Sequence, residues 1–238
     1  MKLLITTRSD KTVTDWEELT HPILKNYAEK VGADFLVLNE EYDAKDATGG
    51  IGNGVYQFRI FEHYKLHDKY DRILSLDNDI MIHPNCPNIF DCVPYDQIGT
   101  IYEDVGSRKQ WRQNCMIDAQ NQFGFIGWQD GYINTGVFLT SKCHKDIFQK
   151  INGKYFVDWG TDDVHIGYLI NKYGYKVKRL PYQWNHMTMF SEPWNQSADR
   201  FQSNIIHYAG NGVFEKNSVS DKLEQAKKDF EVLYGKPA

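Results

Sequence analysis

The sequence predicts an α/β fold with a mostly parallel central sheet flanked by helices, formed as a single domain over residues 1–238. Three observations support this prediction. Short apolar stretches of strand length alternate with longer stretches in which apolar residues recur every three or four positions, the order expected of strand–helix–strand units. Neither an internal repeat nor a linker divides the chain. A chain of 238 residues is also long enough to bury a full core.

Composition excludes several functional classes. Hydrophobic residues make up 41% of the chain and charged residues 25%, as in ordinary globular proteins. A net charge of -5 without a basic cluster argues against nucleic acid or an anionic membrane surface as a partner. No apolar stretch has membrane-spanning length, and the apolar start is too short for a signal peptide. The four cysteines lack zinc-type spacing, so we expect reduced thiols and a cytoplasmic protein.

The first strand, at residues 2–7, is followed by an amphipathic helix. Asp15, with a glutamate three positions on, would form a capping box at the helix N-terminus. Pro22 is expected to kink the helix. A glycine ends it before a second strand at residues 35–38, so a right-handed crossover would place the two strands parallel. The apolar residues of one helix face lie at positions 13, 16, 19, 23, 27 and 31.

A glycine-rich loop and a second helix lead to the third strand. Residues 43–54 hold four glycines and no periodicity, which indicates a flexible loop. A helix is expected over residues 55–66, with Arg59 off its apolar face. Arg59 is then either a solvated helix charge or a cation that faces a binding site, because this helix runs directly into the next strand.

The stretch 72–82 is the strongest functional signal. A buried strand runs into Asp77-Asn78-Asp79, and an apolar triplet follows. Residues i and i+2 of an extended backbone point the same way, so Asp77 and Asp79 can direct oxygens at one volume. A divalent cation such as Mn²⁺ or Mg²⁺ would relieve their repulsion and leave positions for a nucleoside diphosphate. The alternative is a turn in which the aspartates bond backbone amides. The buried flanks favour the metal.

The middle of the chain contains a long irregular stretch. A helical turn at residues 88–93 and a strand at residues 97–102 precede residues 104–130, which show no periodicity. Their length and their aromatic residues favour a mobile lid or an acceptor wall over plain disorder. Residues 131–139 then bring Asn134 and Gly136 before an apolar strand. This pattern indicates either tight backbone beside a ligand or a β-bulge.

Two acidic residues open the next helix. Asp162 and Asp163 are followed by helical periodicity that Gly174 ends. Acids are favoured at a helix N-terminus, but two in succession leave one carboxylate free for other work. A strand is expected at residues 176–180.

The C-terminal part adds a further wall, a strand and a last helix. Residues 184–196, rich in aromatic residues without a period, would form a pocket wall. A short strand at residues 205–210 contains His207, which is either a ligand or a satisfied core histidine. The last helix, at residues 221–234, is expected to turn Tyr234 and its other apolar residues inward and its lysines outward.

The order of these pieces resembles the nucleotide-sugar glycosyltransferases of the A-type (GT-A, Rossmann-like) fold over nearly the whole chain. Asp77-Asn78-Asp79 matches their Asp-x-Asp motif. Asn134-Thr135-Gly136-Val137 is similar to their glycine-containing segment before a central strand, and Asp162-Asp163 falls where their second acidic motif lies.

Within that fold the motifs resemble more than one family. His207-Tyr208-Ala209-Gly210 is similar to the His-x-x-Gly of the glycogenin-like retaining family, whose histidine completes the metal site. The Lys-Pro-Trp that follows in that family is absent, and only Lys216 lies nearby. Residues 162–167 look more like the Glu-Asp-Val segment of inverting β1,3-transferases.

The resemblance implies transfer of a sugar from a UDP-sugar to a hydroxyl of a carbohydrate or glycoconjugate acceptor. It implies Mn²⁺ or Mg²⁺ held by Asp77, Asp79 and His207. Residues from about 1 to 102 would bind the nucleotide sugar, and those from about 103 to 238 the acceptor. Thr6, Thr7 and Arg8 end the first strand, where open α/β sheets bind ligands. The full set of expected donor-binding residues is Thr6, Thr7, Arg8, Arg59, Asp77, Asn78, Asn134, Gly136, Gly210 and Lys216.

The stereochemistry depends on the second acidic pair. The likeness of residues 207–210 and Arg59 to the glycogenin-like arrangement favours retention, in which Asp162 or Asp163 would hold sugar hydroxyls. In an inverting reaction Asp163 would be the general base.

Two other functions stay open: a metal-dependent nucleotidyltransferase and a catalytically inactive sugar-binding module. A nucleotidyltransferase would usually carry a glycine-rich phosphate loop after the first strand, and residues 5–9 hold no glycine. The sugar, the acceptor and the oligomeric state are not determined by the sequence.

Overall fold

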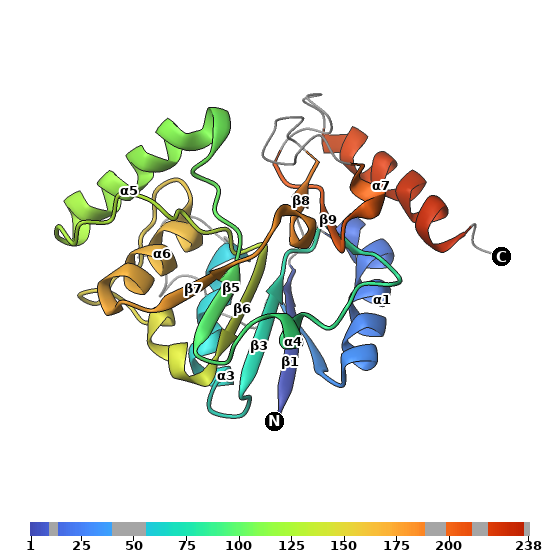
Figure 1. Cartoon of the computed structure of the whole chain (residues 1–238), viewed down its shortest axis with the longest axis horizontal. Helices are drawn as coiled ribbons and strands as arrows, with labels where there is room; N and C mark the ends of the chain where they lie inside the picture. The colour runs from blue at the N-terminus through green and yellow to red at the C-terminus, as the bar shows by residue number, and fades with distance from the viewer. Residues whose placement is uncertain (10–13, 40–55, 189–198, 211–218, 236–238) are drawn as a thin grey trace.

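The structure, a computed structural model, forms a large sheet covered by helices on both faces, with a smaller sheet beyond one end of it (Figure 1). The glycine-rich stretch 43–54, Lys216 and most of the expected wall at residues 184–196 lie outside the described residues. The residues that the structure describes are 1–9, 14–39, 56–188, 199–210 and 219–235.

The large sheet confirms the predicted α/β class. Its strand order is β2-β1-β3-β6-β5-β7. All its strands run parallel except β6, which is antiparallel to both neighbours. The bounds are β1 (Leu3–Arg8), β2 (Asp34–Leu38), β3 (Arg72–Leu76), β5 (Gln97–Thr100), β6 (Val137–Ser141) and β7 (Lys176–Arg179).

Helix α1 (Thr14–Val31) packs on one face of this sheet through the apolar side predicted from its periodicity. Its buried residues include Trp16, Ile23 and Tyr27. The helix already begins at Thr14, so Asp15 lies in its first turn and is not the N-cap that the sequence predicted. It continues through Pro22 and ends before the next glycine, whose φ is 70°.

The opposite face is covered by a second group of helices. Adjacent residues of β6 point to opposite faces of the sheet. Val137 packs in the hydrophobic core beneath α1, and Phe138 packs in the core on the opposite face. The single helix expected at residues 55–66 is instead a 3-10 helix followed by a short α-helix. Phe58 and Phe61, three positions apart, remain together in the core because three residues complete a 3-10 turn. The elements are η1 (Tyr56–Glu62), α3 (His63–Leu66), η3 (Lys142–Phe148) and α6 (Thr161–Tyr173).

Contrary to the sequence prediction, the stretch 104–130 is not irregular, whereas its role as a lid or an acceptor wall stays a prediction. It forms a short turn, η2 (Gly106–Arg108), and the helix α5 (Lys109–Phe123), whose partner is α6. The buried side of α5 includes Arg112 and Gln120 beside apolar residues. These buried polar residues interrupt the apolar stripe, which explains why no helical period is visible in the sequence.

The smaller sheet joins β4, which follows the third strand, to segments near the end of the chain. Its order is β4-β9-β8, with β4 antiparallel to β9. The bounds are β4 (Ile80–Ile82), β8 (His186–Met187) and β9 (Ile205–His207). The remaining elements are α4 (Ile89–Cys92), η4 (Tyr182–Trp184), η6 (Arg200–Gln202) and α7 (Val219–Tyr234).

Helix α7 is fixed to β9 by polar contacts. Asp229 accepts two hydrogen bonds of 2.7 Å from Arg200 and one of 2.6 Å from the hydroxyl of Tyr208. One expectation for α7 is wrong, since Lys222 points inward and is buried. Tyr234 is 38% exposed but directs its hydroxyl at the Ile82 carbonyl of β4. The buried face of α7 is thus partly polar, so apolar periodicity identified only part of it.

The four cysteines are free thiols, as expected. Among the helices in the described part of the chain, none combines the length and the apolar character that crossing a bilayer requires.

Candidate metal centre and its surroundings

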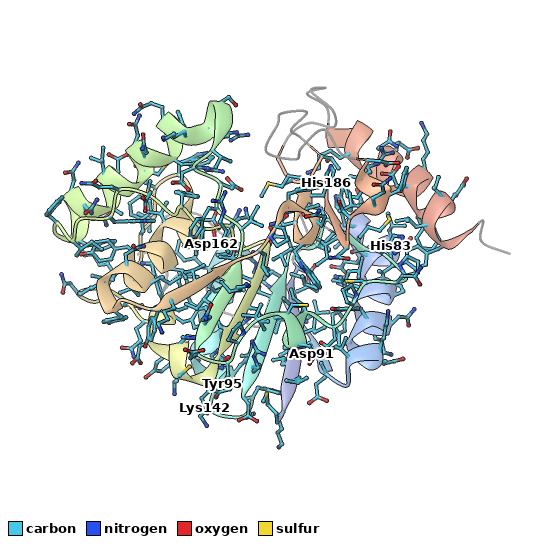
Figure 2. The ribbon with its side chains drawn as sticks, viewed as in Figure 1. His83, Asp91, Tyr95, Lys142, Asp162 and His186 are labelled. Carbon is cyan, nitrogen blue, oxygen red and sulfur yellow. The ribbon has the colours of Figure 1, made fainter. Side chains whose placement is uncertain are left out.

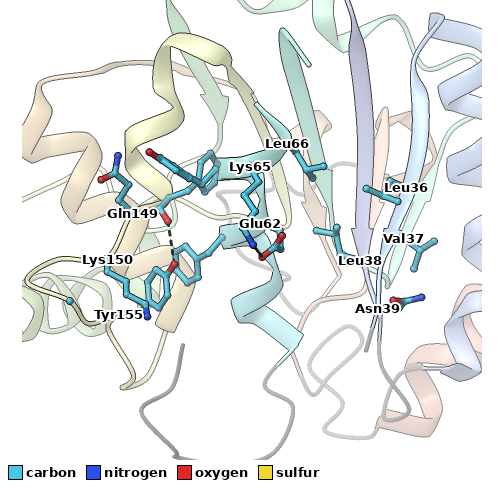
Figure 3. A pocket seen from close by; sticks show the side chains of 14 residues that line it. Leu36, Val37, Leu38, Asn39, Glu62, Lys65, Leu66, Gln149, Lys150 and Tyr155 are labelled. Atoms are coloured by element: carbon cyan, nitrogen blue, oxygen red, sulfur yellow. Dashed lines mark hydrogen bonds and ion pairs between the residues drawn. The ribbon is translucent and has the colours of Figure 1, made fainter. Parts of the chain in front are cut away.

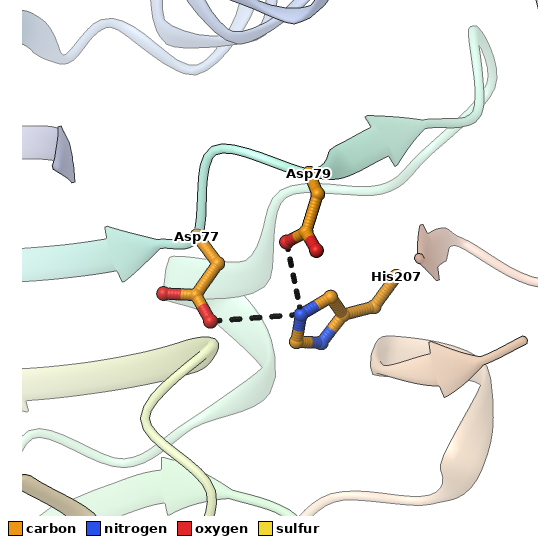
Figure 4. Close-up of side chains that lie close together, drawn as sticks. All are labelled: Asp77, Asp79 and His207. Atoms are coloured by element: carbon orange, nitrogen blue, oxygen red, sulfur yellow. Dashed lines mark ion pairs between the residues drawn. The ribbon is translucent and has the colours of Figure 1, made fainter. Parts of the chain in front are cut away.

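Asp77, Asp79 and His207 come together at the end of the large sheet (Figure 4). One potential ligand atom from each lies within 4.8 Å of the others. The His207 Nε2 atom is 3.2 Å from Asp79 Oδ1 and 3.5 Å from Asp77 Oδ2. The trio expected from the sequence is therefore assembled, although His207 lies 128 positions after Asp79 in the chain.

Strand register explains the meeting. Asp77 follows β3, and its amide donates a 2.9 Å hydrogen bond to the carbonyl of Gly136, just before β6. Asp79 precedes β4, whose Ile80 is paired with His207 of β9. The amide of Tyr208 donates to the Asp79 carbonyl at 2.9 Å. Backbone pairing at both strand ends thus fixes the three side chains.

The second carboxylate oxygen of Asp77 and of Asp79 contacts a positively charged side chain. The guanidinium of Arg8 contacts Asp77 Oδ1, and the ammonium of Lys222 lies 3.2 Å from Asp79 Oδ2 and 2.7 Å from the Gly210 carbonyl. Asp77 Oδ2 and Asp79 Oδ1 therefore remain directed at His207. Burial opposes the charged form of Asp79, but His207 and Lys222 outweigh it and hold the pKa of this carboxyl well below its usual range.

Arg8 links the metal-ligand trio to the second acidic pair. It is 1% exposed and also forms an ion pair with Asp162 at the start of α6. Asp162 lies near the same end of the sheet in Figure 2. Neither Asp162 nor Asp163 caps the helix, because the N-cap is Gly160, which has no side chain to do so. Both acids lie in the first turn of α6, where negative charge is favoured, and their carboxylates tie the helix to neighbouring segments.

Thr135 holds both acids from the other side. Its hydroxyl lies 2.9 Å from Asp162 Oδ2 and 2.8 Å from Asp163 Oδ1, and its amide donates to Asp163 Oδ1 at 2.7 Å. Burial, together with the neighbouring Asp162 charge, raises the pKa of Asp163 to about 7. Arg112 and the Thr135 hydrogen bonds lower it less than these raise it. Asp163 is therefore a carboxyl able to exchange a proton near neutral pH.

Gly136 lies against the ligands. A Cβ at this position would be 2.4 Å from His207 Cε1 and 2.9 Å from Asp77 Oδ2. No larger residue fits without moving a ligand, so the close backbone approach predicted from the Asn134-to-Gly136 segment is present. The neighbours it approaches are side chains of the site itself.

Asn134 is bonded inside the protein. Its Oδ1 accepts from the Gly136 amide at 2.9 Å and from Asn185 Nδ2 at 2.8 Å, and its Nδ2 donates to Glu103 at 2.6 Å. Glu103 forms a buried ion pair with Arg112. The sequence had not singled out Glu103, Asn185 or Arg112, because nothing in their local pattern distinguishes them.

Other expected donor-binding residues are mostly buried. Thr6 and Thr7 have no exposed surface, and the Thr6 hydroxyl lies 2.9 Å from His63 Nε2. Arg59 is 3% exposed and donates to the Ser9 carbonyl at 2.7 Å, so the solvated helix charge is excluded. Asn78 is also buried, at 4% exposure. The donor-binding role of these residues stays a prediction.

A separate hollow of about 1020 Å³ lies among β2, α3 and residues 148–155 (Figure 3). None of the metal-ligand trio lines it. Its wall combines apolar strand residues such as Leu36 with charged side chains such as Lys65.

Comparison with known proteins identifies the architecture. No protein-family model and no curated protein sequence matches the chain. Solved structures do match. A glycosyltransferase involved in the glycosylation of the major capsid of PBCV-1 is 14% identical, with a TM-score of 0.62, over 95% of this chain and 100% of that one.

Two further solved structures match nearly all of this chain. The galactosyltransferase LgtC, in complex with donor and acceptor sugar analogs, is 17% identical, with a TM-score of 0.57, over 100% of this chain and 98% of its own. The apo glycosyltransferase GlyE of Streptococcus pneumoniae TIGR4 is 16% identical, with a TM-score of 0.54, over 98% of this chain and 62% of its own. At such identities the likeness establishes the fold. The chain therefore has the GT-A fold, the Rossmann-like architecture of the glycosyltransferases that it matches.

Proposed function

We propose that the protein is a metal-dependent glycosyltransferase that moves a sugar from a UDP-sugar to a hydroxyl of a carbohydrate or glycoconjugate acceptor. The observation that carries the proposal is the convergence of Asp77, Asp79 and His207 in a chain with the GT-A fold. The match to LgtC, whose structure holds donor and acceptor sugar analogs, supports the two partner classes.

The three ligands fit a divalent cation. Two carboxylate oxygens and one imidazole nitrogen suit Mn²⁺, since carboxylates favour Mg²⁺ and Mn²⁺ while imidazole favours the transition metals. The described residues supply three groups, which would leave positions for phosphate oxygens. When bound, the cation would act as a Lewis acid that neutralises charge on the diphosphate leaving group.

We propose that the N-terminal half, up to about residue 102, binds the donor. Gly136 and Asn134 would line the same site from the start of β6. Gly210 would lie at its edge, where its carbonyl holds Lys222. Lys216 and the buried residues Thr6, Thr7, Arg8, Arg59 and Asn78 complete the proposed donor set.

The acceptor would bind the half from about residue 103 onward, where two tryptophans are exposed. Trp111 on α5 is 52% exposed and Trp159, just before α6, is 47% exposed. Their rings stand 5.4 Å apart at 90°, and the guanidinium of Arg112 lies 4.5 Å from the Trp159 ring centroid. Held in this way, the rings offer apolar surface to the C–H face of an acceptor sugar.

We propose retention of configuration, with the acceptor hydroxyl attacking C1 on the face of the departing diphosphate and a phosphate oxygen taking the proton. Asp162 and Asp163 would then hold sugar hydroxyls. The inverting reaction is the second candidate, and one observation favours it: with a pKa of about 7, Asp163 could take the acceptor proton as general base. Proton NMR of the first product formed distinguishes the two by its anomeric configuration.

Release of UDP tests the proposed activity. Wild-type protein with a panel of UDP-sugars and Mn²⁺ is expected to release UDP slowly without acceptor and faster with one. Asp79→Asn should lose this activity while keeping its fold. Absence of UDP release with every donor would favour a sugar-binding module. Release of diphosphate from a nucleoside triphosphate would favour the nucleotidyltransferase.

A further inference from the structure

A chain of buried hydrogen bonds runs from the Glu103–Arg112 ion pair to the back of the His207 ring. It passes from Glu103 through the side chains of Asn134 and Asn185. We propose that Asn185 is a positioning residue whose carbonyl oxygen fixes the proton of His207 on Nδ1, so that Nε2 is presented to the metal. This inference rests on the proposed metal site.

The direction of the chain is set at its far end, where two groups have fixed roles. The backbone amide of Gly136 can only donate, and it lies 2.9 Å from Asn134 Oδ1. Glu103, in contact with Arg112, offers carboxylate oxygens that accept, and Asn134 Nδ2 lies 2.6 Å from one of them. Both contacts require the same orientation of the Asn134 amide.

The orientation of Asn134 determines that of Asn185. Asn134 Oδ1 is an acceptor, so the group of Asn185 that lies 2.8 Å from it must be the NH₂. Asn185 Oδ1 therefore faces His207 Nδ1, also at 2.8 Å. A carbonyl oxygen can only accept, so Nδ1 carries the proton. The ring nitrogen left for a cation is Nε2, the atom that faces Asp77 and Asp79.

Burial makes this arrangement hard to exchange for another. Asn185 has no exposed surface, His207 is 2% exposed and Glu103 is 3% exposed. Turning the Asn185 amide would place its oxygen against Asn134 Oδ1 and its NH₂ against the protonated Nδ1. Both contacts would then be repulsive without water to relieve them. This chain of hydrogen bonds from Glu103 through Asn134 and Asn185, here called the relay, thus selects Nε2 of His207 as the nitrogen that faces the metal.

The relay also explains how distant segments cooperate. Glu103 follows β5, Asn134 precedes β6, Asn185 precedes β8 and His207 ends β9. The amides therefore connect the large sheet to the small one, and the orientation of the metal-ligating histidine depends on both. Hydrogen bonding of the second ring nitrogen is a general means of orienting a metal-ligating histidine.

The first variant removes the hydrogen-bond acceptor opposite His207 Nδ1 but keeps the approximate volume of the Asn185 side chain. Asn185→Leu is expected to weaken Mn²⁺ binding about 10–100-fold, measured by titration calorimetry on metal-free protein without nucleotide. Asn171→Leu, on the exposed side of α6, is the control and should bind Mn²⁺ as wild type does. Circular dichroism and melting establish that each variant is folded.

A second variant separates positioning from packing. Asn185→Asp keeps an oxygen opposite His207 Nδ1 but loses the NH₂ group that donates a hydrogen bond to Asn134 Oδ1. It is expected to bind Mn²⁺ at least about tenfold more tightly than Asn185→Leu, since a carboxylate beside Nδ1 raises ligand basicity. Equal weakening in both variants would show that Asn185 acts only through packing and would overturn the proposal.

A spectroscopic measurement identifies the ligating nitrogen directly. In Cd²⁺-loaded protein labelled with [¹⁵N]histidine, coupling between cadmium and nitrogen is expected at Nε2 of His207, with His207→Ala assigning the signal. Coupling at Nδ1, or an unchanged Mn²⁺ affinity in folded Asn185→Leu, would contradict the relay alone. A wild-type protein that binds no divalent cation would overturn the proposed function and this inference together.

Discussion

Replacing Gly136 by alanine tests whether the ligands are packed as tightly as the structure shows. The new Cβ would lie 2.4 Å from His207 Cε1, whereas carbon atoms in contact normally stand about 3.5 Å apart, so His207 or the backbone must shift by about 1 Å. The same Cβ would lie 2.9 Å from Asp77 Oδ2. Metal–ligand distances tolerate only about 0.2 Å, so such a shift removes a good ligand geometry.

We expect two effects of different size from Gly136→Ala. Overpacking should lower the free energy of unfolding by about 1–3 kcal/mol, since the neighbours are buried side chains with little room to move. Mn²⁺ affinity should fall by about 10–100-fold, as when a group that orients a metal ligand is lost. Calorimetric titration of metal-free protein with Mn²⁺ measures the second effect, and chemical denaturation measures the first.

Gly167→Ala is the matched control. Its Cβ would meet Trp128 at 2.7 Å, a clash of similar size in the other core cluster. This variant is expected to change stability without weakening Mn²⁺ binding. If Gly136→Ala bound Mn²⁺ as tightly as Gly167→Ala does, the close approach of Gly136 to the ligands would not constrain the site.

Three further predictions follow from charge and exposure. The pKa of Asp163 in the folded protein is raised to about 7, so its protonated form should stabilise metal-free protein at low pH. This stabilisation should be lost as the pH rises towards 7. Denaturation at pH 5 and pH 8 should show the loss in wild type and a smaller loss in Asp163→Asn. Lys222→Met should lower the free energy of unfolding of metal-free protein by about 1–3 kcal/mol, because Asp79 loses its buried partner. Lys227→Met, on the exposed side of α7, should change this free energy little. Denaturation with and without Mn²⁺ should show that the metal restores part of the loss. Trp111→Ala should raise the KM for acceptor and leave acceptor-free UDP release unchanged, whereas Phe125→Ala, at an 81% exposed position, should change neither.

The strand-end aspartates were predictable because their geometry is local. Only one residue separates Asp77 from Asp79, so they stay close in any local conformation. The extended backbone expected for them is wrong, because β3 ends at Leu76, residues 78 and 79 form a turn, and β4 begins at Ile80. His207 required more, since its partner strand β4 lies far away in the chain and no local pattern states their register. A family-like motif, and not periodicity, pointed to it.

The cations of the site could not be predicted in the same way. Lys222 lies on a helix whose apolar residues define only part of the buried face, and polar residues at 222 and 229 complete it. Such residues look exposed until the ion pairs that satisfy them are known. Arg8 is similar: its position at the end of β1 indicated a ligand-binding edge, but the structure shows that it bridges Asp77 and Asp162.

Helix α5 shows the same limit for secondary structure. Arg112 and Gln120 occupy its buried side, where Gln120 holds the backbone of Trp128 and Ile126 through hydrogen bonds of 2.8 to 3.1 Å. A polar residue in such a position breaks the apolar period that identifies a helix. Tertiary hydrogen bonding therefore decided an element that hydrophobic periodicity could not predict.

The most direct test of the central claim is the thermal stability of the protein with UDP, measured with Mn²⁺ and again in excess chelator. UDP is expected to raise the melting temperature only when Mn²⁺ is present, because the cation bound by Asp77, Asp79 and His207 would hold the diphosphate. A ligand at about 100 times its Kd adds about 2.7 kcal/mol, which such a measurement resolves. Asp79→Asn should abolish the shift. An equal shift with UDP in excess chelator would contradict a metal-dependent donor site.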